Sequence, residues 1–145
     1  MPRRYMTTMV ALAVACAAVQ LASAQQQSGD SGPLVIPRVK LDDFRARHAS
    51  GSILVVDVRD EFSYKVGHIP NSINVPLPVV EARASEVRER AGQRPVVTYC
   101  SCPSEQTAAS AAVALAKHGV RNVSVLGGGY PEWVATGGAV ERGER

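Results

Sequence analysis

One stretch of the chain, residues 95–119, constrains its fold more than any other. It reads PVVTYCSCPSEQTAASAAVALAKHG, so a short β-branched run ends at Cys100, a compact loop follows, and an Ala-rich helical segment begins. A strand that passes into a helix through such a loop brings backbone N–H groups and a helix N-terminus toward the residue at the strand end. This setting binds anions and favours a thiolate, so Cys100 is the first candidate for a reactive residue, with a buried structural thiol as the alternative.

Other apolar runs predict the remaining strands. Residues 52–58 (SILVVDV) are almost continuously apolar, which is typical of a strand buried on both faces of a parallel sheet. Shorter strands are predicted at 33–39, where Pro37 favours a sheet edge, at 73–75 and at 120–126. Because the segments between the strands have helical character, we expect a parallel sheet covered by helices.

Helices are predicted from apolar spacing and from the residues that open them. In residues 79–91, Val80, Ala84, Val87 and Ala91 recur at helical spacing among charged residues. Phe62 and Trp133 are expected to be core anchors, and turns are expected at residues 67–71 and 127–129. The full set of predicted helices covers residues 41–48, 60–66, 79–91, 108–117 and 130–134.

The N-terminal 24 residues have the pattern of a secretory signal peptide. Two arginines precede an apolar run at 9–21, and the small residues Ala22-Ser23-Ala24 form a cleavage site. We therefore expect export to the periplasm or the medium, with no membrane span after cleavage. Lipidation at Cys16 is a weaker alternative, because apolar sequence continues well beyond it.

The rest of the chain has the length and composition of one domain. Residues 25–33 are polar and small and predict a flexible linker, residues 34–140 form the domain, and residues 141–145 a disordered tail. The net charge of +3 includes Arg3 and Arg4, so the chain without residues 1–24 carries only +1. That balance provides no basic face for nucleic acid.

Without the signal segment, two cysteines remain, Cys100 and Cys102. One C-x-C pair cannot stabilise a domain of this size as a disulfide framework does, so a chemical role is the better interpretation. Two thiolates without a further ligand pattern do not predict a zinc site. We expect no metal and no cofactor.

Four blocks of sequence carry a family resemblance. They are residues 55–77 (VVDVRDEFSYKVGHIPNSINVPL), residues 96–100 (VVTYC), the Ala-rich segment that leads to Val120, and residues 123–133 (VSVLGGGYPEW). At this spacing around a strand-end cysteine, the chain resembles a single rhodanese (sulfurtransferase) domain over residues 35–138.

The resemblance implies a three-layer α/β fold, with a central five-stranded parallel sheet and helices on both faces. It also implies that Cys100 takes a sulfane sulfur from a donor, either a persulfide or thiosulfate, holds it as a persulfide and passes it to a thiol acceptor. A thiol whose pKa is lowered at the helix end would suit this chemistry.

The loop that follows Cys100 departs from the common family pattern. It contains no Arg or Lys and consists of Ser101, Cys102, Pro103, Ser104, Glu105, Gln106 and Thr107. Related phosphatases and arsenate reductases use Cys-x5-Arg to hold an oxyanion, and here Gln106 occupies the arginine position. The sequence therefore argues against phosphatase or arsenate reductase activity.

Two further loop residues affect the choice of donor. Pro103 lacks an N–H and is expected to be the first residue of the helix, and Glu105 is then expected in its first turn. The Glu105 carboxylate would repel thiosulfate, which favours protein or low-molecular-weight persulfides as donors.

Several roles stay open at the level of sequence. Cys102 could resolve a persulfide on Cys100 or merely fill the loop. Asp57 and Arg59 could shape the site or form a structural ion pair, and His68 could support the site or hydrogen-bond its turn. Two alternatives to a sulfurtransferase are a non-catalytic module that binds a protein of the cell envelope and a thiol redox protein that uses both cysteines.

Overall fold

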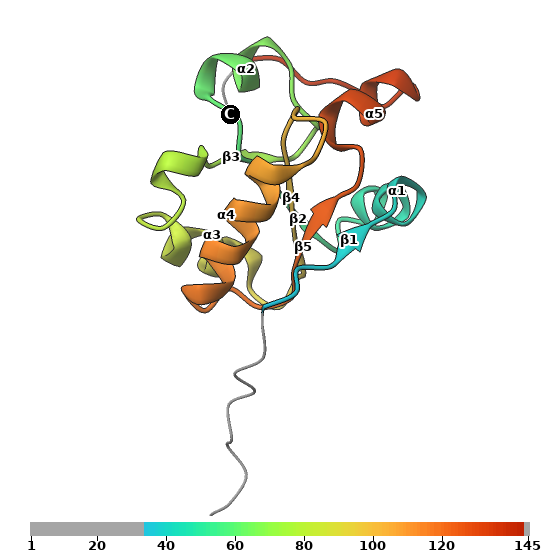
Figure 1. Cartoon of the computed structure of the whole chain (residues 1–145). Coiled ribbons are helices and arrows are strands. Elements are labelled where there is room, and N and C mark those ends of the chain that lie inside the picture. Colours follow the sequence, from blue (N-terminus) through green and yellow to red (C-terminus); the bar gives the residue numbers. More distant parts are fainter. Residues whose placement is uncertain (1–33, 144–145) are drawn as a thin grey trace, which may run out of the picture. The chain divides into compact units, whose positions relative to one another are not determined.

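Five parallel strands form the centre of residues 34–143, which are the residues that the computed structural model describes (Figure 1). The spatial order is β1-β5-β4-β2-β3, and each neighbouring pair is parallel, which confirms the predicted sheet. β4, which delivers Cys100, pairs with β2 on one side and β5 on the other. The strands are β1 (Arg38–Val39), β2 (Leu54–Asp57), β3 (Ile73–Asn74), β4 (Val96–Tyr99) and β5 (Val123–Leu126).

Helices cover both faces of the sheet, as a three-layer α/β fold requires. One core cluster joins the sheet to α3 and α4, and a second joins it to Phe44 of α1 and Trp133 of α5. The predicted burial of Trp133 is thereby confirmed. The helices are α1 (Leu41–Ala49), α2 (Glu61–Val66), the 3₁₀ helix η1 (Leu77–Val79), α3 (Ala84–Ala91), α4 (Gln106–Lys117) and α5 (Gly129–Ala135).

The alternation of side chains along β4 decides on which face the thiol lies. Val96 and Cys100 belong to the cluster beneath α3 and α4, whereas Val97 and Tyr99 belong to the cluster beneath α1 and α5. Cys100 therefore faces the helix that follows its own loop.

Two predictions within these elements were wrong. The helix predicted at residues 79–91 begins only at Ala84, because Val80 reaches the core from the turn that follows η1. Phe62 is 77% exposed, whereas Tyr64 is buried and its hydroxyl donates to the Ser72 carbonyl. Residues two positions apart lie on different faces of a helix, and α2 turns Tyr64 inward.

Several predictions concern the ends of the chain, and most of them fall outside residues 34–143. The predicted signal peptide, the linker at 25–33 and Cys16 lie outside the described residues. Glu141, which the sequence assigned to the tail, forms an antiparallel bridge with His68. Between residues 34 and 143, none of the helices is both long and apolar enough to span a bilayer.

Candidate active site

Cys100 lies directly after β4 and is 2% exposed. Its carbonyl accepts a hydrogen bond from the N–H of Tyr130 in α5, at 2.9 Å. Thr98 Oγ1 donates to the carbonyl of Ala108 at 3.0 Å, which fixes the first turn of α4 over the strand. The strand end, the helix start and α5 thus meet around one cysteine.

The second cysteine of the loop is in direct contact with the first. The Sγ atoms of Cys100 and Cys102 are 2.6 Å apart, and both residues are free thiols. Cys102 is the more exposed of the two, and its Sγ lies 3.5 Å from Thr107 Oγ1. Ionisation of either thiol therefore affects the other.

Burial raises the pKa of the Cys100 thiol, and its hydrogen bond with Cys102 acts in the same direction. The backbone N–H groups of Cys102 and Ala108 favour the Cys100 thiolate but do not outweigh these effects. The sequence-based expectation of a lowered pKa for Cys100 was therefore wrong, because desolvation outweighs the effect of the helix end.

For Cys102, burial acts to raise the pKa, but hydrogen bonds with Cys100 and with the side chain and N–H of Thr107 lower it overall. Cys102 is consequently the more readily ionised thiol of the pair.

Helix α4 begins at Gln106, which is before the predicted segment at 108–117 but after Pro103, the residue expected to open the helix. Pro103 and Ser104 lie in a turn, and the first helical residue is Gln106, so Pro103 is not the helix start. The turn is closed by a hydrogen bond from the Glu105 N–H to the Cys102 carbonyl, at 3.1 Å. Glu105 precedes the helix with φ +48°, a left-handed conformation that directs the chain from the turn into α4.

The side chain of Glu105 points into the protein. It is 5% exposed, its Oε1 accepts from the N–H of Gly128 at 2.7 Å, and its Oε2 pairs with Arg38 of β1. Because the carboxylate charge is compensated by these partners, the repulsion of anionic donors expected from the sequence is reduced.

The glycine run at 127–129 packs directly against the Cys100 loop. Gly129 has φ +54°, and a Cβ at this position would collide with the Cys100 carbonyl. Sequence reasoning predicted unusual dihedrals here, but it missed that Arg38, Gly128, Gly129 and Tyr130 contact the loop. The glycine run was the signal that could have revealed a close backbone approach.

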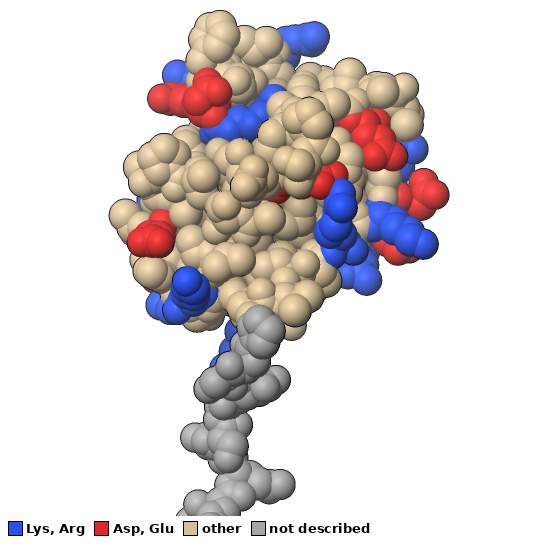
Figure 2. Space-filling view, viewed as in Figure 1, with Lys and Arg blue, Asp and Glu red and all other residues tan. Residues whose placement is uncertain are grey.

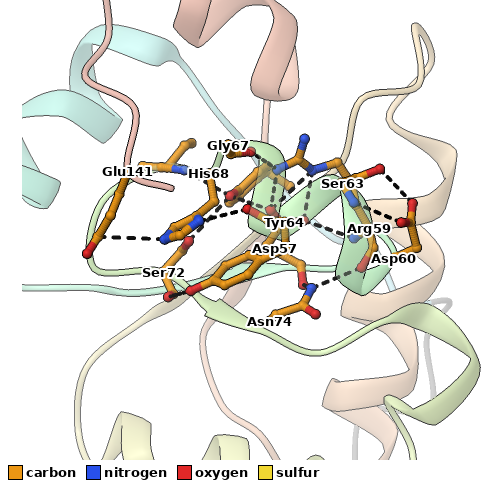
Figure 3. A network of polar contacts seen from close by, with 12 residues as sticks. Asp57, Arg59, Asp60, Ser63, Tyr64, Gly67, His68, Ser72, Asn74 and Glu141 are labelled. Carbon is orange, nitrogen blue, oxygen red and sulfur yellow. Dashed lines mark hydrogen bonds and ion pairs between the residues drawn. The ribbon is translucent and has the colours of Figure 1, made fainter. Parts of the chain in front are cut away.

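Asp57 and Arg59 form a buried ion pair at the end of β2 (Figure 3). Arg59 Nη2 is 2.5 Å from Asp57 Oδ2 and also donates to the Gly67 carbonyl, and the Tyr99 hydroxyl donates to Asp57 at 2.6 Å. The Arg59 guanidinium lies 4.0 Å from the ring centre of Tyr130. The link from this pair to Cys100 is therefore indirect, through Tyr130.

His68 belongs to the same polar network (Figure 3). It is fully buried, its ring stacks on Tyr64, and its Nδ1 lies 2.9 Å from the Tyr64 carbonyl. Its Nε2 faces Glu141 at 3.6 Å. The ring of His68 therefore joins its turn to α2 and faces the segment at Glu141.

The other predicted loop residues are at the surface. Exposed positions are Ser101, Pro103, Ser104 and Gln106. On the face seen in Figure 2, charged side chains lie mainly around the periphery, and the central region over α4 is largely uncharged. Among residues 34–143, no three His, Cys, Asp or Glu side chains are grouped as metal ligands.

A cleft of 630 Å³ lies elsewhere, along β3 and between α2 and the segment that leads into α3. Its lining includes Tyr64, Asn74, Arg83 and Arg90, and none of the residues at positions 100–107. Cleft size therefore does not locate the thiol site, which is defined by its chemistry.

Two known proteins resemble this chain over about two thirds of its length. An HTH-type transcriptional regulator of Mycobacterium tuberculosis is 35% identical over 67% of this chain and 41% of its own length. A putative sulfur carrier protein of Bacillus subtilis is 31% identical over 68% of this chain and 51% of its own length. The chain thus spans about half or less of these two relatives.

A thiosulfate sulfurtransferase of Coxiella burnetii is 33% identical over 57% of this chain and 73% of its own length. Among solved structures, the BH2092 protein of Bacillus halodurans superposes with a TM-score of 0.66 at 31% identity, covering 73% of this chain and 77% of that one. The family model of the rhodanese-like domain matches residues 40–136. The chain therefore belongs to the rhodanese-like domain family.

Proposed function

We propose that this protein is an exported sulfurtransferase that moves sulfane sulfur through a persulfide on Cys100. The observation that carries the proposal is the position of the Cys100 thiol, at a strand end where the N–H groups of Cys102 and Ala108 are directed at its sulfur. Relatives named as a sulfur carrier and as a thiosulfate sulfurtransferase support a role in sulfur transfer.

The proposed reaction has two transfers. The Cys100 thiolate attacks the outer sulfur of a persulfide donor R–S–SH, a sulfur–sulfur bond forms on Cys100, and the donor leaves as its thiolate. A thiol acceptor then attacks the outer sulfur of the Cys100 persulfide and regenerates the Cys100 thiolate. The backbone N–H groups of Cys102 and Ala108 favour the attacking thiolate on Cys100.

The test is a sulfur-transfer assay with glutathione persulfide or thiosulfate as donor and a low-molecular-weight thiol as acceptor. Wild-type protein should turn over, Cys100→Ser should not, and mass spectrometry of a Cys102→Ser variant, which has one thiol in the loop, should find one added sulfur on the peptide that contains Cys100. A matched control is Ser110→Ala, an exposed position of α4. Absence of both turnover and the added sulfur would favour a non-catalytic module that binds an envelope partner.

Export is a separate part of the proposal. It rests on the pattern of residues 1–24, and it predicts that the protein recovered from cells begins at Gln25. N-terminal sequencing of protein from the periplasm or the medium tests this directly. A protein that still begins at Met1 would contradict export, and one lipidated at Cys16 would contradict cleavage after Ala24.

A further inference from the structure

The two thiols of the loop differ in ways that suit different roles. Cys100 is 2% exposed and lies among the core side chains beneath α4, whereas Cys102 is partly exposed and lies beside Thr107. Their sulfurs are nevertheless in contact, at 2.6 Å. A sulfur atom bound at Cys100 would therefore have a second thiol within reach before any external acceptor arrives.

We infer that Cys102 is the resolving thiol of this protein, which attacks Sγ of the Cys100 persulfide, releases the sulfane sulfur as hydrogen sulfide and closes a Cys100–Cys102 disulfide. This inference rests on the proposed function, because it requires a persulfide on Cys100. It assigns a chemical role to a residue that the sulfur transfer itself does not need.

The step balances without an external oxidant. The Cys102 thiolate attacks, the bond between Cys100 Sγ and Cys102 Sγ forms, the bond between the two sulfurs of the persulfide breaks, and the sulfide leaves as HS⁻ with the proton that the persulfide carried. The sulfane sulfur is reduced to sulfide, and the two cysteines are oxidised together to a disulfide. Two equivalents of a low-molecular-weight thiol then reduce the disulfide and leave as their own disulfide.

The geometry favours attack on the inner sulfur over attack on the outer one. The atom that Cys102 contacts is Cys100 Sγ, which becomes the inner sulfur when the persulfide forms. Attack on the outer sulfur would have to expel the Cys100 thiolate, and burial raises the pKa of that thiol and makes it the poorer leaving group. The lowered pKa of Cys102 increases the fraction of the attacking thiolate at neutral pH.

The burial of Cys100 gives the internal reaction a further advantage. An external thiol must reach a residue that is 2% exposed, whereas Cys102 already lies against it. A group held in contact acts at a high effective concentration. A reducing thiol can attack the resulting disulfide at the sulfur of Cys102, because Cys102 is partly exposed.

The experiment is a single turnover under anaerobic conditions with one equivalent of glutathione persulfide and no added thiol. Wild-type protein should release sulfide and end with an intramolecular disulfide, detected as resistance of both cysteines to alkylation. In Cys102→Ser, sulfide release should fall by at least about tenfold, and the added sulfur should remain on Cys100 until a thiol is supplied. Ser110→Ala should behave as wild type.

The outcomes separate the inference from the proposed function. A stable persulfide on wild-type Cys100, or equal sulfide release from Cys102→Ser, overturns the resolving role and leaves the sulfurtransferase intact. If Cys102→Ser carries glutathione on Cys100 in place of one added sulfur, the donor reacts at its other sulfur and both proposals are wrong. No sulfur on either protein contradicts the proposed function itself.

Discussion

The Glu105 carboxylate accepts a hydrogen bond from the backbone N–H of Gly128, at 2.7 Å, and so joins the cysteine loop to the turn that opens α5. Glu105 is buried and has a left-handed backbone conformation, and Gly128 has φ +73°. Both backbone conformations cost free energy in a residue with a Cβ atom. The bond holds the cysteine loop and the turn before α5 together next to Cys100.

Replacement of Glu105 by alanine should destabilise the protein by about 1–3 kcal/mol, because the Gly128 N–H would lose its acceptor. Glu105→Gln keeps an acceptor oxygen and should lose less. Arg38→Ala is the control, since the Arg38 side chain is 64% exposed and such a pair contributes at most about 1 kcal/mol. Urea denaturation measures all three, and equal losses for alanine and glutamine would refute the role of the bond.

Gly129→Ala should disturb the active-site loop as well as stability. The new Cβ would collide with the Cys100 carbonyl, in addition to the strain at φ +54°. Gly137→Ala is the matched control, because Gly137 has φ +79° but open space around it, so only the backbone strain of about 1–2 kcal/mol applies. Thermal unfolding and the alkylation rate of Cys100 should show a larger effect at Gly129, and similar effects at both sites would contradict the packing.

Removal of either thiol should shift the pKa of the other, and in opposite directions. In Cys102→Ala, the pKa of Cys100 should fall, because the hydrogen bond and the charge of Cys102 both raise it. In Cys100→Ala, the pKa of Cys102 should rise, because the hydrogen bond with Cys100 lowers it.

The pH dependence of the alkylation rate provides the measurement. A lower pKa keeps the thiolate to lower pH, so the onset for Cys100 should move toward acid in Cys102→Ala, and the onset for Cys102 toward base in Cys100→Ala. Shifts of the same sign in both variants would show that the thiols do not share a proton as the structure indicates.

Asp57→Asn should be strongly destabilising. The carboxylate is fully buried and paired with Arg59, and removal of one partner from a buried pair typically costs about 3–5 kcal/mol. Glu61→Gln is the control, because the ion pair of Glu61 with Lys65 is on the surface and should change stability by at most about 0.5 kcal/mol. Chemical denaturation that finds the two variants equally stable would exclude a structural role for the Asp57 pair.

Much of the fold was predictable, because its strong signals are local. Residues 52–58 and the run that ends at Cys100 are apolar enough to identify the two central strands, and the Ala-rich segment identifies α4. The exposure of Phe62 was not predictable in this way. A helix as short as α2 has too few turns for its apolar spacing to show which face is buried.

The candidate site was predictable in position but not in its electrostatics. The strand-end location of Cys100 follows from β4 and its loop, whereas the direction of its pKa depends on how deeply the sulfur is buried and where the Cys102 side chain turns. The contact of Gly128 with Glu105 joins residues far apart in the chain, so no local pattern could reveal it.

The alternation along β4 has a consequence for which changes this domain can tolerate. Cys100 faces α4 and Tyr99 faces the layer of Phe44 and Trp133, so inserting or deleting one residue in Val96–Tyr99 would exchange the two faces. The thiol would then lie among aromatic rings, and the Tyr99 phenol would take its place under α4. Apolar substitutions at Val96 and Val97 keep this alternation, but the insertion or deletion of a single residue does not.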